Sequence, residues 1–310
     1  MNLAFIGHHL CQEHKPGAHH PECPERLYAI ADRMIASGME MLVTHYDAPE
    51  VTREQLLRVH DPDYVDLIFN SAPQVDGQLA WIDGDTAMSI GTLPAALRAA
   101  GASIMAVDLV MSDKHHAAFC CVRPPGHHAE RRRSMGFCFF NNVAVGAAHA
   151  LAEYGLKRIA IIDFDVHHGN GTQDIFEGDE RVLFCSSFQH PFYPGTGWET
   201  DAPNIANLPL PKLTDGPTYR AAVAQHWLPR LDAFAPELIM ISAGFDGHAE
   251  DDMAHFNLHT SDFGWITRQL HDLAVKHAQE RIVSCLEGGY ELNALGRCVS
   301  THVDELIGHA

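Results

Sequence analysis

The chain has 310 residues, 46% of them hydrophobic and 20% charged, a balance that excludes a disordered chain and allows a large buried core. Acidic residues outnumber basic ones by 40 to 21, and the formal net charge of −19 disfavours direct binding to nucleic acid and attracts cations. The apolar runs are too short to cross a bilayer and the first residues lack a signal-peptide pattern, so we expect no membrane partner and a cytoplasmic location.

Short apolar runs alternate with longer stretches of helical period, which predicts an α/β fold with helices on both faces of a parallel sheet. In chain order, the predicted strands lie at residues 3–7, 117–122, 158–163, 181–186, 237–243 and 281–286. No repeat, low-complexity segment or linker interrupts this alternation. We therefore expect one domain over residues 1–310.

Helices are expected between these strands. The first begins at Pro24, and its apolar face carries Leu27, Ile30, Ala31, Met34 and Ile35. Thr52 and Gln55 then have the spacing of a capping box. The remaining helices are predicted at residues 92–110, 142–154, 218–234, 261–277 and 292–307.

The numbers and positions of the histidines and cysteines indicate which kinds of metal site or disulfide the chain can form. The 23 histidines are an unusual number, and many lie near Gly and Asp, which indicates proton transfer or metal binding. The eight cysteines form no Cys-x-x-Cys pair, which argues against a zinc–cysteine site or a disulfide framework. Several lie in apolar stretches and are predicted to be buried hydrophobic side chains: Cys120, Cys121, Cys138, Cys185 and Cys285.

Polar clusters follow four of the predicted strands and read RPPGHHAE, DFDVHHGNG, AGFDGHAEDD and EGGYE. An open parallel sheet carries its site at the carboxyl ends of its strands, so these clusters should lie together. Their coincidence at strand ends is the strongest indication of function in the sequence.

Asp165 and His167, two residues apart in an extended segment, can present their side chains to one ion, and Asp246 can supply a third ligand. Three protein ligands with open positions are typical of a catalytic metal site, whereas a structural site is usually closed by four. Alone, Asp165 would be interpreted as a turn or capping residue. The other clusters favour the metal site.

His127 and His128 follow a Pro-Pro-Gly turn and supply two imidazoles that can serve as base and acid in the hydrolysis of an amide. Asp163 and Asn170 are near enough in sequence to orient them, although Asp163 could instead be structural or help to bind a monovalent cation. Tyr290, after two glycines, can donate a hydrogen bond to the oxyanion.

Aromatic residues can form the walls of a narrow channel for an aliphatic chain. We assign Gly136 and Phe137 to one wall, and Phe192 or Tyr193 to another. For Phe139 and Phe140, core packing is the better interpretation.

The motifs HHPECPER, RPPGHHAE, MGFCFFNN, DFDVHHGNGTQ, FYPGTG, SAGFD and LEGGYEL follow one another over most of the chain. This series resembles the histone deacetylase family of the arginase-deacetylase fold, above all the class II deacetylases and bacterial histone deacetylase-like amidohydrolases. The resemblance implies a central eight-stranded parallel sheet and a metal-dependent enzyme that removes acetyl groups from amines.

The resemblance also implies site residues. Zn²⁺, with Fe²⁺ as the alternative, would be held by the three ligands named above; His127 and His128 would be the acid/base pair, and Tyr290 the oxyanion donor. A structural K⁺ would lie near Asp163, Asp165, His167, Ser186 and Ser187. Many relatives read Ser-Leu-His after this strand, whereas this chain reads Ser-Ser-Phe, which changes the surroundings of that ion.

Several alternatives stay open. The substrate can be an acetylated lysine side chain or an acetylated polyamine; polyamine specialists can carry an acidic residue where our alignment places Met253, and the acids at 250–252 are adjacent. A binuclear ureohydrolase of this fold would need a carboxylate where this chain has Gly169. A non-catalytic acyl-lysine-binding scaffold is disfavoured by Tyr290. A homo-oligomer is compatible with the sequence.

Overall fold

The computed structural model describes residues 3–308, and its centre is a parallel sheet with the strand order β2-β1-β5-β10-β9-β6-β7-β8. Two further short strands, β3 and β4, pair antiparallel outside this sheet. The strands are β1 (Leu3–Gly7), β2 (Val43–Asp47), β3 (Ala80–Trp81), β4 (Ala87–Met88), β5 (Ala117–Cys120), β6 (Ile159–Asp163), β7 (Val182–Gln189), β8 (Ile205–Leu210), β9 (Leu238–Ala243) and β10 (Ile282–Leu286).

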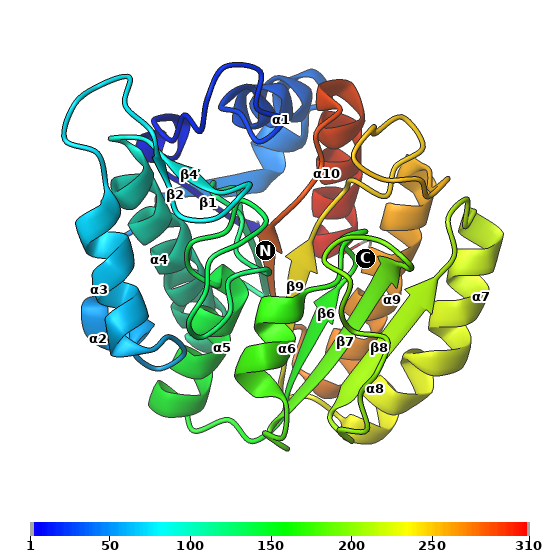
Figure 1. Ribbon diagram of the computed structural model, residues 1–310. Helices are drawn as coiled ribbons and strands as arrows, with labels where there is room; N and C mark the ends of the chain where they lie inside the picture. Colours follow the sequence, from blue (N-terminus) through cyan, green and yellow to red (C-terminus); the bar gives the residue numbers. More distant parts are fainter. Residues whose placement is uncertain (1–2, 309–310) are drawn as a thin grey trace.

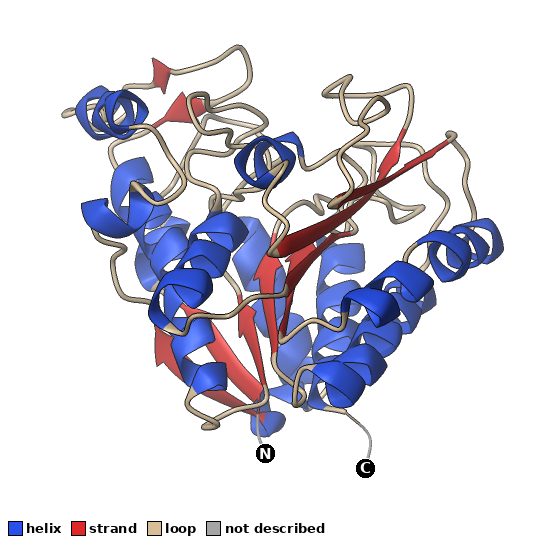
Figure 2. Ribbon diagram, turned by 90° about the horizontal axis from the view of Figure 1, so that it is seen from below, coloured by secondary structure: helices blue, strands red, loops and turns tan. Residues whose placement is uncertain are grey.

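Helices pack on both faces of the sheet (Figures 1 and 2). On one face α4 contacts β1, β5 and β10, and α5 packs beside α4; on the other face α10 contacts β1 and β5 and lies between α1 and α9. The helices are α1 (Glu25–Ala36), α2 (Arg53–Leu56), α3 (Pro62–Ser71), α4 (Thr92–Met111), α5 (Asn142–Glu153), α6 (Asn170–Phe176), α7 (Gly216–His226), α8 (Leu228–Phe234), α9 (Thr260–His277) and α10 (Leu292–Ile307), with short 3₁₀ turns η1 (His9–Gln12) and η2 (Met39–Leu42).

The helix α4 is the one helix among residues 3–308 that is long and apolar enough to cross a bilayer by length and composition. In the structure 61% of its most apolar window is buried. The helix packs against β1, β5 and β10 and beside α5, as core helices of globular domains do.

All six predicted strands are present, and the Thr52–Gln55 capping box forms at the start of α2. The edge strands β2 and β8 were missed. In β2 only Val43 is buried, and β8 contains Asn207 and Pro209, so neither has the apolar run of a central strand.

Two details of the predicted helices are wrong. The stretch at 218–234 is divided into α7 and α8 at Trp227, because Pro229 lacks the N–H that a continuous helix would use. Ala31 and Ile35 are exposed, the latter by 65%, because the buried stripe of α1 follows Leu27, Ile30 and Met34. The cysteines agree with expectation: all eight are free, and only Cys23 is not buried.

Candidate active site

The four polar clusters follow β5, β6, β9 and β10, which are adjacent in the sheet. Since all four strands run parallel, their carboxyl ends lie at one edge, and the loops that follow meet there. Residues more than a hundred positions apart in the sequence, such as Asp165 and Gly288, are in hydrogen-bond contact as a result.

Asp165, His167 and Asp246 form a buried group whose ligand atoms all lie within 4.8 Å of one another. The Nδ1 atom of His167 is 3.1 Å from Asp165 Oδ1 and 3.0 Å from Asp246 Oδ2. Within residues 3–308 this is the one group of at least three such side chains placed closely enough to hold an ion. Two carboxylates and one imidazole suit a divalent cation such as zinc or iron, so the residues fit the predicted metal.

Two glycines make room for the carboxylates. A Cβ atom on Gly288 would lie 2.2 Å from Asp246 Oδ2 and 2.5 Å from Asp165 Oδ2. A Cβ on Gly244 would lie within 1.9 Å of Asp165 Oδ2. Backbone therefore approaches the ligand group where no side chain can fit, and the Gly288 N–H donates to Asp165 Oδ2 at 2.9 Å.

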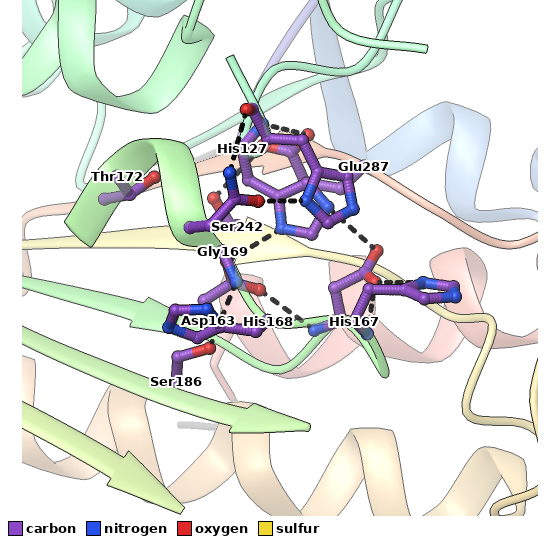
Figure 3. A network of polar contacts seen from close by, with 12 residues as sticks. His127, Asp163, His167, His168, Gly169, Thr172, Ser186, Ser242 and Glu287 are labelled. Atoms are coloured by element: carbon purple, nitrogen blue, oxygen red, sulfur yellow. Dashed lines mark hydrogen bonds and ion pairs between the residues drawn. The ribbon is translucent and has the colours of Figure 1, made fainter. Parts of the chain in front are cut away.

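His127 and His128 are adjacent in sequence but have different partners. His127 Nδ1 is 2.9 Å from Asp163 Oδ2, and His128 Nδ1 is 2.7 Å from Asn170 Oδ1 (Figure 3 shows His127 and Asp163). Burial opposes protonation of His127, but the charges of Asp163 and Asp165 outweigh it and raise its pKa well above the usual value. The structure thus brings Asp163 and Asn170 to the histidines as predicted.

The pKa of His128 moves the other way. Burial and the positive charges of His127 and His167 hold it well below its usual value. A divalent cation bound beside His167 would act in the same direction. His127 is therefore the charged member of the pair and His128 the neutral one, which can accept a proton.

Glu287 holds the backbone of this pair and was missed by sequence reasoning, although it lies in the EGGYE motif. It is fully buried and accepts hydrogen bonds from the N–H groups of Gly126 and His127 and from the Ser242 hydroxyl (Figure 3). Burial raises its pKa to about 7. It fixes the backbone from which both imidazoles project.

Tyr290 lies in the loop between β10 and α10 and is held by two residues that the sequence did not reveal. The Oδ2 atom of Asp251 accepts from the N–H of Tyr290 at 2.6 Å and of Glu291 at 2.9 Å. The guanidinium of Arg26 lies 4.9 Å from the centre of the Tyr290 ring and donates to Gly289 O at 2.6 Å. Burial raises the pKa of Tyr290 well above its usual value, so the phenol stays protonated and can donate a hydrogen bond.

A cavity of about 260 Å³ leads to these residues. All five predicted substrate-binding residues line it, together with Asp85, which the sequence analysis missed. The Phe192 ring stacks on His167 with centroids 5.7 Å apart, and Tyr193 lies edge-on to His128 at 5.4 Å. The lining residues are Asp85, His128, Gly136, Phe137, His167, Phe192, Tyr193, Met253 and Tyr290.

The predicted potassium residues are also neighbours. Ser186 is paired in register with Asp163 across β6 and β7, and its hydroxyl accepts from the Gly169 N–H at 3.4 Å. Ser187 follows it, and its hydroxyl lies 3.2 Å from that of Tyr219. The K⁺ site stays a prediction.

Comparison with known proteins agrees with this geometry. The model of the histone deacetylase domain matches residues 20–306. The crystal structure of the HDA15 HD domain superposes with a TM-score of 0.92 at 31% identity and covers 99% of this chain and 90% of that one. The chain therefore belongs to the histone deacetylase family.

Several relatives show the range of that family. Type-2 histone deacetylase 2 of Dictyostelium discoideum is 36% identical over 97% of this chain, and polyamine deacetylase HDAC10 of Homo sapiens is 37% identical over 93%. This chain spans only 20% and 45% of their lengths. A histone deacetylase-like amidohydrolase of Pseudomonas aeruginosa is 34% identical over 98% of this chain and 86% of its own length. The chain thus carries a deacetylase-type hydrolase domain.

Proposed function

We propose that this protein is a zinc-dependent deacetylase, with Fe²⁺ as the alternative ion, that hydrolyses the acetyl-lysine amide or a similar acylated amine. The observation that carries the proposal is the buried group of Asp165, His167 and Asp246, which lies beside His128 and Tyr290 at the cavity between aromatic walls. When bound there, a divalent ion would polarise the amide carbonyl and lower the pKa of a water molecule.

The chain's own residues supply the remaining steps. His128, kept neutral by its surroundings and bonded through Nδ1 to Asn170, accepts a proton from the attacking water at Nε2 and returns it to the leaving amine. The Tyr290 hydroxyl donates a hydrogen bond to the carbonyl oxygen as negative charge develops on it. His127, paired with Asp163, contributes positive charge next to the reacting group.

Metal analysis tests the assignment of the ligands. Asp165→Ala and Asp246→Ala should each lose bound metal and turnover together while the fold largely survives, because each removes a charged ligand from an open site. Asp272→Ala, on the exposed surface of α9, is the matched control and should keep both. Stoichiometric metal with wild-type turnover in the two ligand variants would refute the site. Loading the wild type with zinc or iron separately identifies the ion that supports turnover.

We propose acetyl-lysine over acetylated polyamines because Met253, a neutral residue, lines the cavity where our alignment expects a polyamine-selecting carboxylate. The net charge of −19 attracts any polycation, but this attraction is screened within about 10 Å at 0.1 M salt and discriminates poorly between cations. A carboxylate placed at the cavity would instead contribute roughly 10²-fold in kcat/KM.

The substrate proposal is tested by measuring kcat/KM for acetylspermidine and an acetyl-lysine peptide at low and high salt. Met253→Glu should shift the preference towards the polyamine. In wild type, high salt should lower kcat/KM for both substrates to a similar extent. A wild-type preference for acetylspermidine above about 10²-fold that persists in high salt would overturn the argument.

A persistent preference for acetylspermidine would favour the alternative function, an acetylpolyamine amidohydrolase. The similarity to the human polyamine deacetylase supports this alternative. A non-catalytic acyl-lysine-binding scaffold is the third candidate, and it would bind acetyl-lysine without turnover.

For the structural K⁺ we propose a site near Asp163 and Ser186. If the ion is bound there, replacing K⁺ by a large organic cation should lower the thermal stability of the protein.

A further inference from the structure

The tip of the β3–β4 ribbon holds the backbone of one channel wall. Thr86, which is 1% exposed, accepts a hydrogen bond from the Phe137 N–H at 3.1 Å. Its neighbour Asp85 accepts from the Gly136 N–H at 3.0 Å. The Thr86 hydroxyl donates to the same Asp85 oxygen at 2.8 Å, which aligns the two acceptors.

These two bonds fall on a strained segment. Gly136 has φ +55° and Phe137 has φ +69°, and Phe137 is not a glycine, so its left-handed conformation persists only where the surroundings impose it. This backbone conformation directs the Phe137 ring edge-on towards the ring of Tyr290, with the centroids 6.1 Å apart. The ribbon tip therefore determines where this wall lies.

Asp85 also faces the opposite wall. Asp85 and Tyr193 line the same cavity, and the Tyr193 ring lies edge-on to His128. One carboxylate is thus bonded to one wall through the Gly136 N–H and shares the cavity with Tyr193 of the other wall.

We infer that Asp85, Thr86 and Tyr193 form a clamp that fixes the distance between the two aromatic walls and so selects acylated amines on unbranched aliphatic linkers. Thr86 and Tyr193 are positioning residues in this scheme: they set the wall positions through Asp85 and the Phe137 backbone. The inference rests on the proposed function and adds the residues that set its specificity for the linker. The simpler interpretation is that Thr86 only stabilises the ribbon.

The test compares two acetamides on the metal-loaded enzyme. One carries the acetyl group on a straight alkyl amine, as in an acetyl-lysine peptide, and the other on a benzylic amine, whose linker is wider. The measured quantity is the ratio of their kcat/KM values. A variant that merely destabilises the protein lowers both values alike and leaves the ratio unchanged, so the ratio reports the channel.

Thr86→Val removes the hydroxyl at nearly constant volume, and Tyr193→Phe removes the other hydroxyl while keeping the ring. Each should lower the ratio at least 5-fold by relaxing one wall, and Thr86→Ser should restore it. Tyr154→Phe is the matched control. The Tyr154 hydroxyl donates a hydrogen bond of 2.8 Å to Asp108 of α4, and neither residue lines the channel. The ratio of this variant should equal that of wild type.

An unchanged ratio in Thr86→Val and Tyr193→Phe, with metal content retained, would overturn the clamp. If Thr86→Val does not fold, the ratio of Tyr193→Phe decides by itself. If wild type hydrolyses no acetamide, the proposed function fails, and the clamp is then tested by the ratio of dissociation constants of straight and benzylic hydroxamates, which needs no turnover.

Discussion

At the scale of single residues, Tyr290 has a backbone fixed by Asp251 and a ring that faces Arg26. Tyr290→Phe should leave metal content and substrate binding unchanged and lower kcat by about 10²-fold or more, the usual effect of removing one oxyanion donor. Steady-state kinetics with metal analysis checks this. A near-normal kcat would make Tyr290 a loop residue and favour the scaffold function.

His127 and His128 should differ in importance although they are adjacent. His128→Ala should cost more in kcat/KM than His127→Ala, because His128 is the neutral imidazole that can accept a proton, whereas His127 is held charged by Asp163. Both variants should bind metal, since neither residue belongs to the ligand group. Small and equal losses would remove both residues from the mechanism.

At the scale of elements, the loops after the strands are packed so closely that glycine is required at some positions and not at others. Gly288→Ala should abolish metal binding and activity, because its Cβ would enter the space of the Asp165 and Asp246 carboxylates. Gly247→Ala is the control beside Asp246: its Cβ would meet Leu258, Phe256 and Val166 at ordinary distances of 3.5 to 3.7 Å. If Gly288→Ala keeps full metal content, the described packing of the ligand loop is wrong.

Those loops were predictable as a group because local patterns locate strands and the parallel arrangement then dictates where their ends meet. The edge strand β2 escaped prediction because most of its side chains are not buried and its apolar signal is weak. The edge strand β8 escaped because Asn207 and Pro209 interrupt its apolar run. The break between α7 and α8 could have been predicted from Pro229.

At the scale of the whole molecule, buried neutral histidines link stability to pH. His60 accepts from the Asn141 N–H and its other nitrogen lies 3.0 Å from Glu130 O, so the neutral ring is fully satisfied. Burial lowers the pKa of His60 to about 4. The unfolded chain binds this proton near pH 6.5 and the native protein only near pH 4, so the stability contributed by the neutral ring is lost as pH falls through that window.

The expected loss in the free energy of unfolding is about 3 kcal/mol for this one group. Urea unfolding at several pH values gives the free energy of unfolding as a function of pH. Between pH 6.5 and 4 this free energy should therefore fall less steeply in His60→Gln than in wild type. His226→Gln, an exposed residue of α7, should keep the wild-type dependence. Equal slopes in His60→Gln and wild type would show that His60 is protonated in the native state.

The sequence by itself predicted the fold class, the six inner strands and the central residues of the candidate site, because hydrophobic period and motif spacing are local properties of the chain. Asp85 and Glu287 were not among the predicted residues. The tertiary structure decided how those residues are supported. The contact between Arg26 and Gly289 joins residues 263 positions apart, and that between Thr86 and Phe137 joins residues 51 positions apart. No local sequence pattern can predict either contact. The opposite pKa shifts of His127 and His128 likewise depend on which distant carboxylates and imidazoles surround each ring, and adjacency in sequence cannot reveal that.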